Sequence, residues 1–415
     1  FVKIILGDID RSIEQYWLSA ITTWCLVPAT EHLDPVQLFT ELTTQTYGLI
    51  CEGGQGGPPC FTRWGQNAKL EQHRPFINGV ATGRSWLHDP SIMTTQQFPL
   101  DRFVEARARI RHTVHETPLM GSKALSKCIG VPVYFKCENL QKTGSFKVRG
   151  ALHKVSQLTQ EERAKGVATI SAGNHAQAVA WAAASVEIPC VVVMPENASP
   201  IKVAASKSYG AEVILHGDAK AAFAKVLEVS NDRGLTFLHP FDDEEVVAGH
   251  GTCALEIVEQ LKKVSSVIVP VGGGGLSSGI AAAMAVLNPD ISVWGVEPEG
   301  APSMHRSLES GKPIQLDSIN TIADGLAPPM AGKLNYELLA THARGVVLVT
   351  DDEIVYAMKA LLERMKLVVE PSGAAGLAAL LTNKIRLEPN APVVVILTGG
   401  NADLIQLSAL LSQNS

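Results

Sequence analysis

The chain has 415 residues, which at about 150 residues per domain predicts two to three domains. Its 35 Lys and Arg residues against 41 Asp and Glu residues give a formal net charge of −6, and this argues against a nucleic-acid partner, because such binders carry a basic excess. Hydrophobic residues make up 46% and charged residues 18%, so the chain can bury a large core and is not of the intrinsically disordered class.

Residues 1–95 differ in texture from the rest of the chain. They hold four of the six tryptophans and a Gly/Pro-rich stretch, GGQGGPP, and no long segment shows clean helical or strand periodicity. Short helices are predicted near 12–23 and 35–46. We treat 1–95 as an N-terminal extension to which the sequence assigns no role.

From residue 98 onward, short β-branched runs alternate with Ala-rich amphipathic segments. Strands are expected at 131–138, 167–170, 190–195, 211–216, 235–240, 264–271, 291–298, 345–350 and 392–398. Helices are expected at 147–158, from the Asn174 region to 185, at 200–209, 219–230, after 244, at 276–287, from Asp351 or Asp352 (either of which would cap it), at 372–381 and at 403–411. This alternation predicts βαβ units with parallel sheets covered on both faces. In such folds, ligands bind at loops after the carboxyl ends of strands.

The seven cysteines favour a reducing compartment. They are scattered and no two have CxxC spacing, so we interpret them as reduced thiols rather than as a disulfide framework or zinc site. Their positions are Cys25, Cys51, Cys60, Cys128, Cys137, Cys190 and Cys253. The longest uncharged run, 264–289, has a Gly/Ser-rich centre that favours strand, loop and helix over a membrane span. Without a signal-peptide core at the N-terminus, we expect a cytoplasmic protein with no membrane contact.

The first candidate ligand loop is VGGGGLSSG at 271–279, between a predicted strand and a predicted helix. Four successive glycines let backbone N–H groups surround an anion at a helix start, which suggests a phosphate. A tight turn alone would need only one of them. The spacing Gly273-x-Gly275-x-x-Ser278, with Glu297 after the next strand, also resembles a dinucleotide fingerprint that lacks its third glycine. A dinucleotide-binding oxidoreductase therefore stays open as a remote alternative.

Two further loops carry polar groups at predicted helix starts. In SAGNHAQAVAW (171–181), Asn174 and the free backbone donors suit a carboxylate or a cofactor oxygen, whereas His175 is better explained as a half-buried helix residue. In KCENLQKTGSFKVRGA (136–151), Lys147 lies between Phe146 and Val148, and apolar surroundings depress a lysine pKa and make the amine a nucleophile. Taken alone, this stretch is better explained by a surface lysine. Together, the three loops fit pyridoxal phosphate and an amino-acid substrate.

From about 98 to 411 the chain resembles the pyridoxal-phosphate enzymes of the tryptophan-synthase-β structural class, and among these the threonine/serine dehydratases (ammonia-lyases) and serine racemases. The motifs KTGSFKVRGA, SAGNHAQA, PVGGGGLSSG, GVEPEGA, TIADGLA, ERMKLVVEPSGAAG and LTGGNAD occur in family order. The resemblance implies an α/β fold, a two-lobed three-layer sandwich with parallel-rich twisted sheets. It further implies a large cofactor-binding domain at 96–165 and 244–415, a small domain at 166–243, and a homodimer or homotetramer.

The resemblance also assigns cofactor-binding residues. Lys147 is expected to form the Schiff base with pyridoxal phosphate and Phe146 to lie against its ring. Asn174 is expected to bond the phenolic oxygen, and Thr398, where the family usually has Ser, to face the pyridine nitrogen. The phosphate is expected to be held by Gly272, Gly273, Gly274 and Gly275.

Substrate and cation sites follow by the same resemblance. The substrate carboxylate is expected on the loop with Ser171, Asn174 and His175. A divalent or monovalent cation is a further candidate cofactor, at the set Glu297, Ala301 (by its carbonyl) and Ser303. The third position is usually Asp, so Ser303 weakens the match, and a helix cap explains these residues equally well.

The expected reaction is loss of water from L-threonine or L-serine, with Lys147 as the general base for the α-proton. Serine racemases of this group resemble SSGNH where this chain has SAGNH, and the methyl group of Ala172 cannot donate a proton, so a dehydratase is favoured over a racemase. Another β-hydroxy amino acid, or a ligand-binding descendant without turnover, stays open. The chain ends about ten residues after LTGGNAD, so we expect no feedback by isoleucine through a C-terminal regulatory domain.

Overall fold

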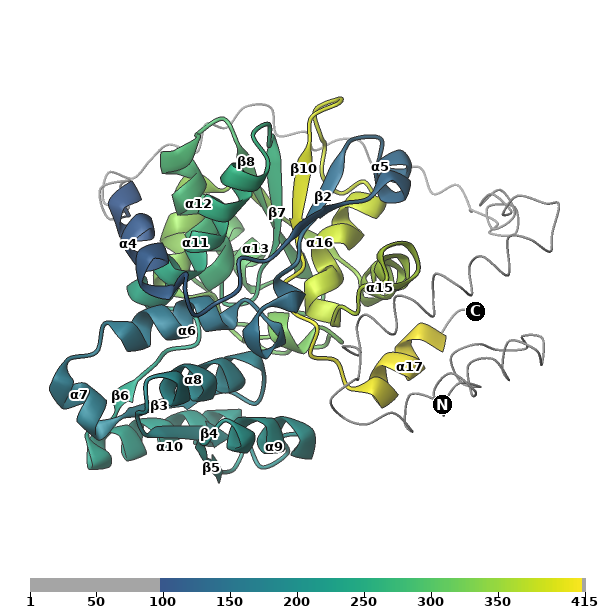
Figure 1. Ribbon diagram of the computed structural model, residues 1–415. Helices are drawn as coiled ribbons and strands as arrows, with labels where there is room; N and C mark the ends of the chain where they lie inside the picture. Colours follow the sequence, from purple (N-terminus) through teal and green to yellow (C-terminus); the bar gives the residue numbers. More distant parts are fainter. Residues whose placement is uncertain (1–97, 413–415) are drawn as a thin grey trace, which may run out of the picture. The chain divides into compact units, whose positions relative to one another are not determined.

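Two β-sheets organise residues 98–412, the part of the chain that the computed structural model describes (Figure 1). The N-terminal extension, the two short helices predicted in it and the cysteines Cys25, Cys51 and Cys60 lie outside the described residues. The fold is α/β with mainly parallel sheets, as expected from the alternation of apolar runs and amphipathic segments.

The larger sheet has the strand order β1-β2-β10-β7-β8-β9. Every neighbouring pair is parallel except β1 and β2, which are antiparallel with Leu119 opposite Lys136. Its strands are β1 (Leu119–Gly121), β2 (Val133–Lys136), β7 (Ser266–Pro270), β8 (Ser292–Pro298), β9 (Gly345–Val349) and β10 (Val393–Ile396). All five residues of β7 are buried, which matches a central strand covered on both faces.

Helices cover both faces of the larger sheet. One face packs against α4 (Leu100–Ile110), α11 (Glu244–Gln260), α12 (Gly275–Leu287) and α14 (Lys333–His342). The other packs against α5 (Lys123–Ile129), α15 (Asp351–Met365) and α16 (Pro371–Leu381). The remaining elements near this sheet are the helices α13 (Ser303–Ser310) and α17 (Leu404–Ser412) and the short 3₁₀ turns η2 (Glu138–Leu140), η3 (Lys142–Gly144) and η4 (Asp324–Leu326).

The smaller sheet has the order β5-β4-β3-β6 and is parallel throughout. Its strands are β3 (Val167–Ile170), β4 (Cys190–Met194), β5 (Glu212–Leu215) and β6 (Thr236–Phe237). The side chains of β4 alternate between the two faces: Cys190 and Val192 pack with α8 (Asn174–Ser185) and α6 (Lys147–Ser156), whereas Val191 and Val193 pack with α10 (Ala219–Arg233). Helices α7 (Gln160–Lys165) and α9 (Pro200–Ser208) complete this part of the chain.

The expected strands and helices are present, with ends shifted by a few residues. The uncharged run 264–289 is strand β7, the glycine loop and α12, and no helix among the described residues is both long and apolar enough to cross a bilayer. The four described cysteines are free. One expectation was wrong: α15 is capped by Thr350, not by Asp351 or Asp352. Thr350 Oγ1 accepts from the Glu353 N–H, and the Glu353 carboxylate accepts from the Thr350 N–H, forming a capping box.

Candidate active site

Lys147 is the first residue of α6, and its side chain is half-buried with the amine inside the protein. Nζ donates a hydrogen bond of 2.8 Å to the carbonyl of Pro240 and lies 5.1 Å from the centre of the Phe146 ring. Desolvation by burial lowers the pKa of Lys147 to about 8. The expectation of a depressed lysine pKa from apolar neighbours is therefore confirmed in direction.

Two buried imidazoles that interact with the Lys147 charge, those of His175 and His250, are disfavoured in their protonated form. Burial, with the Lys147 charge as a lesser cause, holds the pKa of His175 and of His250 well below the ordinary value. His250 meets the Phe146 ring edge-on, with ring centres 4.8 Å apart. Burial is therefore the cause that favours the neutral, nucleophilic form of the amine.

The four glycines form the turn between β7 and α12, and packing alone excludes side chains there. Gly274 has φ +95°, a left-handed conformation that favours glycine. A Cβ at Gly272 would lie 2.9 Å from the Gly325 carbonyl oxygen, and one at Gly275 would lie 2.9 Å from that of Phe241. A Cβ at Gly273 would collide with the Phe241 ring. Glycine at these positions therefore lets neighbouring residues pack directly against the backbone of the loop.

One short segment brings the lysine and the glycine loop together. Pro240 accepts the Lys147 hydrogen bond, and the next residue, Phe241, places its ring against Gly273. The amide of Asn335 ties the same two stretches, because Nδ2 donates to the carbonyls of Phe241 (3.0 Å) and Gly273 (2.8 Å). These contacts place the two predicted groups at one site.

Asn174, the first residue of α8, is held at both ends of its amide. Nδ2 donates to Glu370 Oε1 at 2.7 Å, and Oδ1 accepts from Asn401 Nδ2 at 2.9 Å. In the same loop, Ser171 Oγ accepts from the Gly173 N–H. His175 is buried more deeply than expected, with Nε2 3.5 Å from the Leu238 carbonyl and Nδ1 without a hydrogen-bond partner.

Thr398 is buried just beyond the end of β10, and its carbonyl accepts from the Phe146 N–H at 3.1 Å. This bond joins the start of α6 to the C-terminal edge of the larger sheet. The Asn174 loop likewise follows β3, and the glycine loop follows β7. All three polar stretches therefore lie beyond carboxyl ends of parallel strands, where ligands of such folds bind.

The candidate cation residues serve the start of α13. Glu297 accepts from Ser303 Oγ (3.2 Å) and from the backbone N–H groups of Met304 and His305 (both 2.8 Å), and the Ala301 carbonyl accepts from the Ser303 N–H. Burial raises the pKa of Glu297 to about 8. No group of three or more His, Cys, Asp or Glu residues within 98–412 is arranged to hold a metal ion. The Glu297 carboxylate is occupied by a helix terminus, so it does not support the dinucleotide interpretation.

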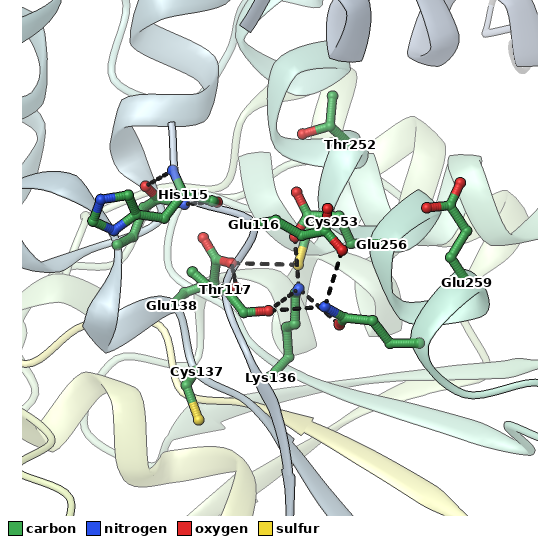
Figure 2. Close-up of polar contacts among 12 residues, drawn as sticks. His115, Glu116, Thr117, Lys136, Cys137, Glu138, Thr252, Cys253, Glu256 and Glu259 are labelled. Carbon is green, nitrogen blue, oxygen red and sulfur yellow. Dashed lines mark hydrogen bonds and ion pairs between the residues drawn. The ribbon is translucent and has the colours of Figure 1, made fainter. Parts of the chain in front are cut away.

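A buried four-charge cluster anchors the helix that carries Lys147. Arg149 of α6 contacts both oxygens of Glu138 at 2.8 Å and both oxygens of Glu256 at 2.6 and 2.8 Å. Lys136 of β2 completes the cluster with a 2.6 Å contact to Glu256 and a 2.7 Å bond to the Thr117 carbonyl (Figure 2). The four side chains are at most 5% exposed. Two cations and two carboxylates balance, so the cluster fixes α6 without leaving a net buried charge.

Sequence reasoning missed this cluster and missed Glu370 and Asn401. A lysine within the apolar strand VPVYFKCE was one signal, because a charge in a buried strand requires a partner. The EPSG and GGNAD stretches that carry Glu370 and Asn401 were recognised as motifs, but without a role for these residues.

The residues present fit pyridoxal phosphate. Its aldehyde requires an amine that can lose its proton near physiological pH, and burial lowers the pKa of Lys147 from its ordinary value to about 8. Its phosphate requires backbone donors at close range, and the glycine turn leads directly into the first turn of α12, whose N–H groups lack helical partners. Its ring oxygen requires a donor such as the Asn174 amide.

Comparisons with known proteins agree with this chemistry. A model of the pyridoxal-phosphate dependent enzyme family matches residues 110–399. An L-threonine ammonia-lyase of Geobacter sulfurreducens is 44% identical over 316 residues, covering 76% of this chain and 78% of that protein. A serine racemase of Dictyostelium discoideum is 42% identical, covering 74% and 96%. The structure of maize serine racemase superposes with a TM-score of 0.73 at 40% identity, covering 75% of this chain and 96% of that one.

Proposed function

The chain belongs to the pyridoxal-phosphate dependent enzyme family, and we propose that it removes water from L-threonine, L-serine or both by α,β-elimination. The water lost in the elimination is regained on hydrolysis of the unsaturated product, so the net products are ammonia and 2-oxobutanoate or pyruvate. The observation that carries the proposal is the desolvated Lys147 amine, joined through Pro240 and Phe241 to the glycine loop.

Each site residue has a distinct part in this reaction. Pyridoxal phosphate supplies an electron sink for the substrate α-carbon when it is bound. Lys147 would hold it through the aldehyde, and the free Lys147 amine would accept the α-proton as general base. The glycines 272–275 hold the phosphate and Asn174 donates to the ring oxygen. Ser171, Asn174 and His175 receive the substrate carboxylate, and Phe146 lies against the ring.

Thr398 supports elimination over transamination. We assign it to the pyridine nitrogen, where a hydroxyl, unlike a carboxylate, cannot retain a proton by charge pairing. A ring without that proton would be a weaker electron sink, which would favour loss of the β-hydroxyl over transamination.

Serine racemisation is the second candidate activity, because serine racemases are among the relatives. Racemisation requires an acid or base on the opposite face of the α-carbon from Lys147. At the second position of the Asn174 loop this chain has Ala172, whose methyl group exchanges no proton. Dehydration is therefore the activity that we propose.

One set of assays tests both activities. The purified holoenzyme should show a visible absorbance band that borohydride abolishes, and Lys147→Ala should lose both the band and the turnover. Release of 2-oxobutanoate from threonine and of pyruvate from serine, measured alongside D-serine formation, ranks the substrates. A protein that stays colourless and inert after addition of pyridoxal phosphate would overturn the proposal. Formation of D-serine by the wild type would show that the protein is a serine racemase. If Ala172 is what prevents racemisation, Ala172→Ser should gain the ability to form D-serine.

Several coarser features go with this function. We propose a cofactor-binding domain at 96–165 and 244–415 and a small domain at 166–243, supported by the two separate sheets. We also propose a cytoplasmic homodimer or homotetramer; the free thiols among the described residues suit a reducing compartment. Light scattering of the purified protein tests the assembly. A cation at Glu297, Ala301 and Ser303 stays a prediction from the family resemblance.

A further inference from the structure

Glu370 and Asn401 hold the amide of Asn174 between them, and we propose that both are positioning residues that fix this amide as a hydrogen-bond donor toward the cofactor. Neither belongs to the site predicted from sequence. The inference rests on the proposed function, because it assigns to Asn174 a ligand that the active enzyme binds. Its evidence is a chain of hydrogen bonds in which each partner determines the orientation of the next.

The chain of bonds begins at a backbone carbonyl. Asn401 Nδ2 donates to the Thr143 carbonyl at 2.7 Å, and since a carbonyl only accepts, this bond fixes which end of the Asn401 amide carries nitrogen. The same Nδ2 donates to Asn174 Oδ1, which turns Asn174 Nδ2 toward Glu370. An ionised carboxylate only accepts, so Glu370 requires the same orientation independently. One N–H of Asn174 is used by Glu370, and the other is left for a ligand.

The surrounding backbone is shaped around this arrangement. Thr143 has φ 55°, which is unusual for a residue with a side chain, and this conformation accompanies the presentation of its carbonyl to Asn401. A Cβ at Gly144 would collide with Asn401 Oδ1. At Gly399 a Cβ would collide with Glu370 Oε1 and lie 3.1 Å from Asn174 Nδ2. Three elements distant in sequence thus converge on one amide.

Ionisation of Glu370 adds a pH dependence to this positioning. Burial raises the pKa of Glu370 to about 7, opposed by the Asn174 hydrogen bond. Lys202 of α9 lowers this pKa and Asp324 of η4 raises it, and these two side chains pair with each other at 3.2 Å. Protonated Glu370 can donate as well as accept, so it no longer dictates the orientation of the Asn174 amide. Donation toward the cofactor is therefore firmest above pH 7.

A double-mutant cycle on cofactor affinity tests the inference. Glu370→Ala is expected to weaken binding of pyridoxal phosphate by about tenfold, and Asn401→Ala by a similar factor, measured by fluorescence titration of the apoenzyme. If both act through Asn174, adding Glu370→Ala to Asn174→Ala causes no further loss. Equal losses in the two backgrounds would show that Glu370 acts independently of Asn174 and would overturn the inference.

The conservative exchange Glu370→Gln keeps an acceptor oxygen but cannot ionise. In the wild type, ionisation of Glu370 is expected to change the visible band of the bound cofactor between pH 6 and 8. Glu370→Gln is expected to bind the cofactor within about threefold of wild type and to lose this change. Glu353→Gln, the same exchange in the capping box of α15, is the matched control and should leave the band and its pH dependence unchanged. A Glu370→Gln titration identical to wild type would contradict the inference. Absence of any cofactor band in the wild type would instead refute the proposed function.

Discussion

The carboxylate of Glu256 is the link between the two cations of the buried cluster, and its replacement by Gln should destabilise the fold severely. Glu256 contacts Lys136 at 2.6 Å and Arg149 at 2.6 and 2.8 Å. In Glu256→Gln the two cations face Glu138 alone, so one positive charge is left buried without compensation. Removing one partner of a buried ion pair typically costs about 3–5 kcal/mol.

That cost can be converted into a shift of the melting temperature. An unfolding entropy of about 2.1 cal/mol/K per residue, taken over the 315 residues from 98 to 412, gives about 0.7 kcal/mol/K. The expected loss therefore lowers Tm by about 5–8 °C. Differential scanning calorimetry of the apoprotein and urea unfolding at pH 7 measure the two quantities separately.

Glu259, one turn further along α11, is the matched control. It pairs with Arg107 at 2.5 Å, but the Glu259 side chain is 52% exposed, and such surface pairs contribute about 0–1 kcal/mol. Glu259→Gln should therefore change Tm by less than about 1.5 °C. Adding Lys136→Met to Glu256→Gln removes one charge of each sign and should recover at least half of the loss. Equal Tm losses for the two single variants, or no recovery in the double variant, would refute the reasoning.

Three further predictions follow from the site and the cysteines. The neutral form of Lys147 is the reactive one, and burial lowers its pKa to about 8. The rate at which the apoenzyme takes up pyridoxal phosphate should therefore rise about tenfold per pH unit below pH 8 and level off above it. A flat stopped-flow profile from pH 6 to 9 would contradict this. Gly273→Ala places a methyl group against the Phe241 ring and should weaken cofactor binding by at least about tenfold. Adding Phe241→Ala should recover part of this loss. Binding of the cofactor to Gly273→Ala at wild-type affinity would show that the loop tolerates the methyl group. Iodoacetamide at pH 8 should label the exposed Cys128 in the native protein. It should label Cys137 and Cys190 only after unfolding, because burial raises the pKa of each of these thiols to about 12. Peptide mapping of the labelled protein measures both outcomes.

Runs of apolar residues and of glycines in the sequence predicted the strands and turns that depend only on neighbouring residues. Continuous apolar runs such as CVVVM became fully buried strands, and the glycine run became the turn between β7 and α12. Strand β1 escaped notice because three residues cannot display a period, and it forms only by antiparallel pairing with β2. The cap of α15 was misplaced by one residue, since Thr350 and Asp351 are both good caps and only the reciprocal bond with Glu353 distinguishes them.

Long-range polar partners could not be predicted in the same way. Lys147 and Asn174 were found because each begins a helix within a recognisable motif. The bond from Asn174 to Glu370 spans 196 residues of sequence, and the pairing of Lys136 with Glu256 spans 120. A charge in an apolar strand indicates that a partner exists, but only the packed fold determines which one.

Lys147 and Arg149, two residues apart on α6, place opposite demands on their surroundings. Lys147 requires burial without a counter-charge, so that its amine loses its proton, whereas Arg149 requires full compensation. Glu138 and Glu256 balance Arg149 and Lys136, so the cluster has no net charge and its electrostatic effect on Lys147 falls off steeply with distance. Desolvation therefore accounts for the lowered pKa of the Lys147 amine. Glu256→Gln removes this balance and leaves a net positive charge on the cluster that anchors α6, and we expect this charge to lower the pKa of Lys147 further. The pH profile of cofactor uptake should then move to lower pH in Glu256→Gln and stay in place in Glu259→Gln; an unmoved profile in a folded Glu256→Gln protein would show that the cluster acts on stability alone.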